Sequence, residues 1–134
     1  MASELEIEIW GDGKQTRSFC YISDCLEGIY RLMNSDFVEP LNLGQDRMIS
    51  INDLADIIAG IAGIRVKKLH VPGPQGVRGR NSDNTLLQKV LGWSPQVSLE
   101  EGLTSTYAWI EEQVKASLIP QTTVISMPAA SSAP

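Results

Sequence analysis

The 134-residue sequence has few of the residues and segments that mark several protein classes. It has two cysteines, Cys20 and Cys25, which are too few for a disulfide framework, and a single histidine, His70, so no second histidine can complete a zinc set. No apolar run approaches the roughly 20 residues that a transmembrane helix needs. The first six residues include acidic side chains and no apolar core, unlike a signal peptide. We therefore expect a chain that works in a reducing cytosol and away from membranes.

Positive charge is also scarce. The 11 Lys and Arg residues face 16 Asp and Glu residues, which gives a net charge of -5. This balance argues against a protein that binds nucleic acid or an anionic membrane surface. Hydrophobic residues make up 43% of the chain and charged residues 20%, so one globular domain can bury a core of its own.

Short stretches of alternating or β-branched residues predict several strands. Residues 5–10 alternate apolar with acidic side chains, as a half-buried strand does. The turn at residues 11–13 (Gly-Asp-Gly) leads to a second predicted strand over residues 18–22, so these two strands are expected to form a hairpin. Further strands are predicted over residues 41–43 and 65–71. Interleaved with helices, these strands indicate an α/β or α+β class.

Each of four predicted helices follows a serine that can cap its first turn. These serines are Ser23, Ser50, Ser82 and Ser98, and the helices are expected to end near Asn34, Ala62, Gly92 and Ser117. The first helix carries one apolar face, made of Leu26, Ile29, Tyr30 and Met33, and the second a buried stripe, made of Leu54, Ile57, Ile58 and Ile61. The last helix carries a face of Leu103, Tyr107, Ile110 and Val114. Residues 118–134 contain no charge and many Ser, Ala, Thr and Pro residues, which predicts a disordered tail after a folded domain over residues 1–117.

A glycine motif lies between the strand predicted over residues 65–71 and the helix predicted after Ser82. Residues 73–79 have the spacing G-x-x-G-x-x-G, which some dinucleotide-binding folds place at the pyrophosphate. Pro72 and Pro74 lack the backbone N–H groups that such a loop would use. No strand with an acidic residue for a ribose follows the next helix. The sequence therefore predicts a surface loop here rather than a dinucleotide site.

Arginines in an acidic chain are candidate anion ligands. Arg78 and Arg80 lie two residues apart, a spacing that places side chains on the same side of an extended backbone. Residues 15–17 (Gln-Thr-Arg) offer amide, hydroxyl and guanidinium groups after the glycine turn. Guanidinium groups suit the bidentate binding of phosphate oxygens. Composition by itself leaves open whether these side chains bind a phosphate or a sugar, or belong to an ordinary polar hairpin and a solvated loop.

Longer motifs resemble extended short-chain dehydrogenases/reductases that act on nucleotide sugars, and they match the carboxy-terminal half of that α/β fold. The segments that carry this resemblance are residues 10–19 (WGDGKQTRSF), 24–28 (DCLEG), 41–44 (LNLG), 91–95 (LGWSP) and 101–103 (EGL), with Trp109. Residues 73–84 (GPQGVRGRNSDN) are more specific. Together with residues 10–19, they closely resemble the GDP-mannose 3,5-epimerases, and the likeness covers about residues 7–113. The chain is then expected to be the substrate-binding portion of that fold, with short strands and about four helices.

The resemblance implies a GDP-sugar as the ligand and assigns side chains to it. Gln15, Thr16, Arg17 and Arg80 are expected to contact the GDP-sugar, with Arg80 at the diphosphate. Arg78 is an additional candidate phosphate contact. The resemblance therefore favours the phosphate-binding interpretation that composition left open. It implies no metal.

The chemistry of the resembled family needs parts that these 134 residues do not contain. Family members oxidise the sugar transiently at C4 with NAD, a Cys/Lys pair inverts C3 and C5, and the products are GDP-L-galactose and GDP-L-gulose. The NAD loop, a Tyr-x-x-x-Lys pair and the Cys/Lys pair belong to the family's amino-terminal half. No tyrosine in this sequence is followed four residues later by a lysine, as the Tyr-x-x-x-Lys pair requires. Neither Cys20 nor Cys25 matches the motif of the catalytic cysteine. The resemblance thus implies no catalytic residue, no bound NAD and no turnover by this chain alone.

Two further hypotheses remain open at the level of the sequence. The chain could be a non-catalytic module that forms a dimer or pairs with a full-length epimerase, through an apolar face that a missing lobe leaves open. It could also be a fragment of another nucleotide-sugar enzyme, such as a 4-epimerase or a 4,6-dehydratase.

Overall fold

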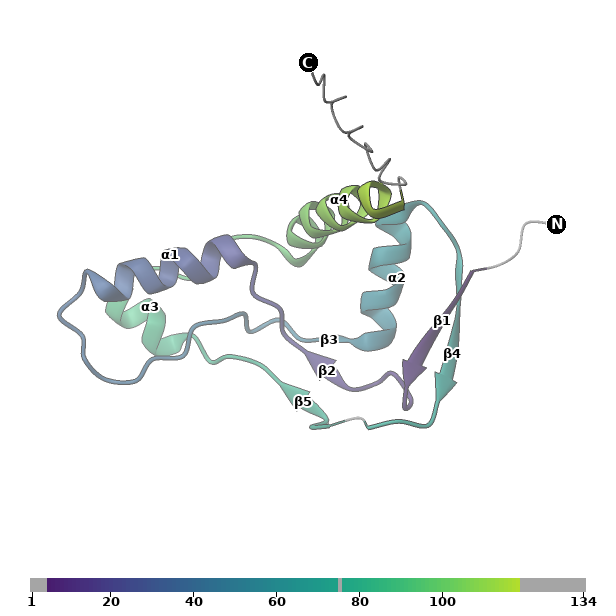
Figure 1. The fold of residues 1–134 in the computed structure, drawn as a ribbon. Coiled ribbons are helices and arrows are strands. Elements are labelled where there is room, and N and C mark those ends of the chain that lie inside the picture. The colour runs from purple at the N-terminus through teal and green to yellow at the C-terminus, as the bar shows by residue number, and fades with distance from the viewer. Residues whose placement is uncertain (1–4, 75, 119–134) are drawn as a thin grey trace, which may run out of the picture.

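The computed structural model describes residues 5–74 and 76–118, which form an α/β fold with two small sheets (Figure 1). The strands are β1 (Leu5–Trp10), β2 (Thr16–Arg17), β3 (Ile49–Ser50), β4 (Val66–Val71) and β5 (Gly79–Arg80). The helices are α1 (Ile22–Met33), α2 (Ile51–Ala62), α3 (Thr85–Leu91) and α4 (Leu99–Leu118). The α/β class and the four helices expected from the sequence are confirmed. Leu118 ends α4, and the rest of the predicted tail lies outside the described residues.

The first sheet differs from the predicted hairpin. β1 pairs in parallel with β4, in a register that runs from Leu5 opposite Val66 to Trp10 opposite Val71. Residues 18–21 form no strand, so the hairpin prediction was wrong. The glycines of the turn at residues 11–13 adopt positive φ angles of 77° and 67°, and the chain leaves them for the other sheet. Parallel strands need a long crossover, and here α1 and α2 lie within it.

The second sheet has the order β3-β2-β5 and lies between the β1–β4 pair and the end of the molecule formed by α1 and α3 (Figure 1). β2 runs antiparallel to β3 and parallel to β5. In the parallel pair, Thr16 lies opposite Gly79 and Arg17 lies opposite Arg80. A Cβ atom at position 79 would lie 2.9 Å from the Thr16 Oγ1 atom, so a larger residue there would make the Thr16 side chain or the strand shift. The surface loop predicted at the glycine motif thus runs directly into a short strand, β5.

Two of the four predicted helix caps are confirmed. The Ser50 hydroxyl accepts a hydrogen bond of 3.1 Å from the backbone N–H of Asp53, and Gly63 ends α2 in the left-handed conformation at φ 65°. Ser98 and Glu101 form a reciprocal capping box. The Glu101 N–H donates to the Ser98 hydroxyl at 3.3 Å, and the Ser98 N–H donates to the Glu101 carboxylate at 3.1 Å.

The other two predicted caps were wrong. α1 begins before Ser23, and its capping position is Tyr21, whose side chain makes no capping hydrogen bond. α3 begins at Thr85 rather than after Ser82, and the Thr85 N–H donates to the Asp83 carboxylate at 3.0 Å. In both places a serine suitable for capping is present but does not cap the helix, and the Ser82 hydroxyl donates instead to the Asn84 Oδ1 atom at 2.9 Å.

α1 packs against the rest of the molecule through the face that carries Gly28. A Cβ atom on Gly28 would lie 2.5 Å from Leu43 Cδ1 and 3.0 Å from the Trp93 ring, so only glycine lets α1 approach these side chains. Leu43 lies in the segment over residues 41–43, for which a strand was predicted. That prediction was wrong, because the segment forms no strand. The opposite, apolar face of α1 is exposed. Its members are Ile22, Leu26, Ile29, Tyr30 and Met33, with exposed fractions from 45% to 78%.

The core is small and surrounds α2, which packs against α4, β3 and β4. Its buried apolar residues are Ile9, Ile49, Ala55 and Ala59, and Leu87 is buried separately on α3. The α2 stripe predicted from the sequence is half-buried, and the α4 face is exposed at Ile110 and Val114. None of the helices in the described part of the chain is long and apolar enough to cross a membrane.

Candidate functional site

Two arginines that lie 63 positions apart in the sequence meet at one pocket. Arg17 on β2 and Arg80 on β5 are register partners across the parallel strands. Both line an open pocket of about 260 Å³. The rest of its wall is Ser18, Cys20, Leu43, Gly44, Gln45, Asn81 and Ser82. Two arginines beside polar side chains, in a chain of net charge -5, make this pocket a candidate anion site.

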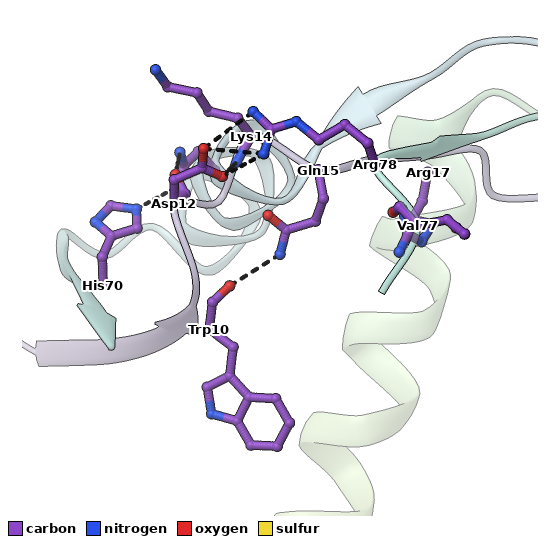
Figure 2. Close-up of polar contacts among 9 residues, drawn as sticks. Trp10, Asp12, Lys14, Gln15, Arg17, His70, Val77 and Arg78 are labelled. Atoms are coloured by element: carbon purple, nitrogen blue, oxygen red, sulfur yellow. Dashed lines mark hydrogen bonds and ion pairs between the residues drawn. The ribbon is translucent and has the colours of Figure 1, made fainter. Parts of the chain in front are cut away.

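The two guanidinium groups differ in how they are held. The Arg17 Nη1 atom donates to the backbone oxygens of Thr16 at 2.7 Å and Val77 at 2.8 Å, which fixes its orientation. Figure 2 shows Arg17 beside Val77. Within residues 5–74 and 76–118, the Arg80 guanidinium has no hydrogen-bond or ion-pair partner, and its residue is exposed. Arg80 can therefore turn its donors toward an incoming anion without first breaking a bond to another described residue.

Gln15 and Thr16, which the resemblance assigned to the ligand, are not in the wall of this pocket. Gln15 is 7% exposed and points toward Trp10, whose backbone oxygen accepts from the Gln15 Nε2 atom at 3.1 Å (Figure 2). Its Oε1 atom is buried and has no hydrogen-bond partner among the described residues. The Thr16 hydroxyl lies 3.5 Å from the Met48 sulfur. The structure thus places both residues next to the pocket along β2 and its approach, but directs them elsewhere.

Arg78 and Arg80 do not converge on one place. The Arg78 guanidinium binds both carboxylate oxygens of Asp12 through three hydrogen bonds of 3.1 Å (Figure 2). The pKa of Asp12 lies below its ordinary value, mainly because the Lys14 backbone N–H donates to its carboxylate, with Arg78 adding to the effect. Arg78 is therefore committed to a carboxylate, whereas Arg80 lines the pocket.

Cys20 is a wall residue that sequence patterns did not single out for this role. Burial raises the pKa of its thiol, and the nearby Asp24 carboxylate and Cys25 act in the same direction. A protonated thiol is a weak nucleophile, so Cys20 is suited to forming the wall rather than to catalysis. Leu43, Gln45 and Asn81 are further wall residues, and no spacing in the sequence connects them with Cys20.

The glycine loop does not fit the pyrophosphate of a dinucleotide. The chain leaves β4 at Val71 and continues into β5, so no helix starts at the end of the loop. α3 begins later, at Thr85, and Asp83 already accepts from its first N–H group. Pro72 and Pro74 contribute no N–H donors. Among the described residues, no group of three His, Cys, Asp or Glu side chains is placed to hold a metal ion.

Comparison with known proteins connects this arrangement with one family. Residues 1–44 match the NAD dependent epimerase/dehydratase family. The chain is 54% identical over 108 residues to GDP-mannose 3,5-epimerase 1 of Oryza sativa subsp. indica, an alignment that covers 81% of this chain and 29% of the relative. This chain thus spans less than a third of that relative's length.

Solved structures of the same kind share the fold. The UDP-glucose 4-epimerase of Thermotoga maritima, determined with UDP-glucose, matches with a TM-score of 0.76 at 32% identity, covering 81% of this chain and 36% of that one. The UDP-glucuronic acid 4-epimerase of Bacillus cereus, determined with UDP-glucuronic acid and NAD, matches with a TM-score of 0.74 at 30% identity and the same coverages, 81% and 36%. Sequence and fold agree, and the chain belongs to the NAD-dependent epimerase/dehydratase family.

Proposed function

We propose that residues 1–117 are the substrate-binding part of a GDP-mannose 3,5-epimerase and bind a GDP-linked sugar in the pocket between Arg17 and Arg80. The observation that carries this proposal is the pairing of these two arginines across β2 and β5 beside an open pocket. The 54% identity to the rice GDP-mannose 3,5-epimerase supports GDP-mannose as the substrate, with GDP-L-galactose and GDP-L-gulose as the products of the whole enzyme.

The pocket offers different chemistry to different parts of such a ligand. The planar guanidinium of Arg80, with its donors unengaged by described residues, suits the bidentate binding of diphosphate oxygens. Arg17 supplies a second, oriented positive charge. Gln45, Asn81 and Ser82 in the wall can exchange hydrogen bonds with ribose or hexose hydroxyls. The Oε1 atom of Gln15 has no partner among the described residues but lies outside this wall, so it would accept only from a part of the ligand that extends beyond the pocket.

We further propose that this chain by itself binds without turning the substrate over. In the family, NAD supplies a transient oxidation of the sugar, and the glycine loop of this chain does not fit that cofactor. Cys20, with its raised pKa, is not poised to remove a proton from carbon. We therefore assign NAD to the intact family enzyme and not to these residues. Two free cysteines are consistent with a place in the reducing cytoplasm.

Protection of Cys20 tests the pocket directly. In a Cys25→Ser variant, GDP-mannose is expected to slow alkylation of Cys20 by about fivefold or more, because the ligand covers the pocket wall. The rate is measured by mass spectrometry at mildly alkaline pH, since the raised pKa leaves little thiolate at pH 7.

A Cys20→Ser variant serves as the control, because Cys25 is outside the wall and its alkylation should not respond to the ligand. Equal protection by UDP-glucose would favour a fragment of another nucleotide-sugar epimerase or dehydratase. An unchanged Cys20 rate at millimolar GDP-mannose would contradict the proposal.

A second candidate function is favoured by the exposed apolar face of α1. Ile22, Leu26 and Met33 are each at least 60% exposed, whereas the opposite face of this helix packs inward at Gly28. Such a face suits a non-catalytic module that pairs with a full-length epimerase or with a second copy of this chain.

Light scattering tests this alternative. If α1 is an interface, a mixture with full-length GDP-mannose 3,5-epimerase, or the chain alone at high concentration, should show a mass above that of one 14.7 kDa chain. A Leu26→Glu variant should lose the association, whereas Val38→Glu, at a still more exposed site outside the helix, should keep it. A wild-type chain that stays monomeric in both settings would contradict the interface.

A further inference from the structure

Asp12 lies where the glycine turn, the start of α2 and the end of β4 meet, and its own position is fixed from several sides (Figure 2). Its carboxylate accepts from the Lys14 N–H at 2.9 Å, and its backbone oxygen accepts from Asn52 Nδ2 at 3.0 Å. The Asn52 Oδ1 atom lies 2.9 Å from His70 Nε2. A Cβ atom on Gly13 would collide with the Asn52 side chain, so the turn sits tightly on α2. The Asp12 carboxylate is thus a preorganised acceptor.

Arg78, the residue that Asp12 binds, directly precedes β5 in the sequence. Arg78 donates to both Asp12 oxygens, and the Arg78 backbone oxygen accepts from the Thr16 N–H at 2.8 Å. The Arg80 backbone oxygen then accepts from the Ser18 N–H at 3.2 Å. β5 has only two residues, so few ladder bonds hold it against β2. The ion pair anchors the start of this strand by a side-chain contact, together with the Arg17 Nη1 atom, which donates to the Val77 backbone oxygen.

We propose that Asp12 is a positioning residue for the anion pocket: by holding Arg78, it keeps β5 in register with β2 and keeps Arg80 beside Arg17. This inference rests on the proposed function of that pocket. It makes Arg78 an anchor of the strand rather than a ligand of the phosphate. Simple electrostatics predicts the opposite sign, because a carboxylate near a phosphate site should weaken binding and its removal should strengthen it.

The sign of the effect of Asp12→Asn on GDP affinity separates these possibilities. Asparagine keeps an acceptor for the Lys14 N–H and removes the charge. We expect the Kd for GDP, measured by isothermal titration, to rise about fivefold, an Arg78→Gln variant to show a similar rise, and the double variant to be no weaker than either single one. Glu6→Gln is the matched control, since it removes the same charge from the exposed Glu6–Lys67 ion pair on β1 and should leave the Kd unchanged.

Tighter or unchanged binding by Asp12→Asn would overturn the proposal. Losses that add in the double variant would also overturn it, because they would place Arg78 directly on the phosphate. A second readout does not need the ligand. In Asp12→Asn, hydrogen exchange at the amides of Thr16 and Ser18 should become faster by about threefold or more, whereas the amide of Gly92, which caps the end of α3, should not change.

The two readouts keep the two proposals apart. If the wild-type chain fails to bind GDP, the proposed function fails, and the exchange rates still decide whether Asp12 anchors β5. Unchanged exchange at Thr16 and Ser18 would overturn the anchoring role whatever the affinity.

Discussion

Replacing Arg80 with glutamine is expected to weaken the binding of GDP-mannose by about 10- to 100-fold. Arg80 lines the pocket opposite Arg17, and its guanidinium is not engaged by any described residue, so its donors are available to the diphosphate. A hydrogen bond to a charged group contributes about 1.5–3 kcal/mol, and each 1.4 kcal/mol corresponds to about a tenfold change in Kd. Glutamine keeps much of the side-chain length but loses the charge and the fork of donors. Isothermal titration of the two proteins measures the difference.

A matched control separates a contact from a general effect of charge. Arg65→Gln removes the same charge from an exposed site just before β4, away from the pocket wall, and should change the Kd by less than about twofold. If both variants lose affinity equally, only net charge matters. If Arg80→Gln binds as the wild-type chain does, Arg80 does not contact the ligand.

Replacing Asp24 with alanine is expected to lower the free energy of unfolding by about 2–5 kcal/mol. Asp24 is 6% exposed, and its Oδ2 atom accepts from the backbone N–H groups of Gln96 at 2.9 Å and Val97 at 2.7 Å. It thereby joins the first turn of α1 to the segment just before α4. Alanine would leave two part-buried donors without a partner and would remove a negative charge from the start of a helix. Urea unfolding followed by circular dichroism measures the change.

Two other variants show whether the hydrogen bonds account for this loss. Asp24→Asn keeps an oxygen that can accept from both N–H groups, so it should lose less stability than Asp24→Ala. Asp36→Ala, at an exposed site after α1, should change the free energy of unfolding by less than about 0.5 kcal/mol. A chain with Asp24→Ala that unfolds at the wild-type urea concentration would show that these bonds contribute no net stability.

Elements set by local patterns were predictable, whereas their pairing was not. The alternation over residues 5–10 and 65–71 located β1 and β4, and the capping residues Ser50 and Ser98 located the starts of α2 and α4. These features depend on residues a few positions apart. The pairing of β1 with β4 depends on segments about 60 residues apart, so the local turn suggested a hairpin that the fold does not contain. A two-residue strand such as β2 is too short to show any periodicity.

The apolar face of α1 shows a second limit of sequence patterns. Helical periodicity correctly places Leu26, Ile29 and Met33 on one side of the helix. Periodicity does not say whether a second surface covers that side, and in this structure the helix packs through Gly28 instead. Whether this face is exposed depends on the segments that pack around the helix, and the sequence of the helix itself does not determine those segments.

The amino-acid sequence by itself determined the four helices, the two longer strands β1 and β4, and which side chains can bind an anion, because these depend on the chemistry of residues and their near neighbours. Tertiary structure alone decided which of those side chains meet. The parallel register of β2 and β5 brings Arg80 to Arg17, while Asp12 draws Arg78 to another place, although Arg78 and Arg80 look alike in the sequence. Charge attraction and strand pairing act across tens of residues, and they divide two neighbouring arginines between anchoring a strand and facing the pocket.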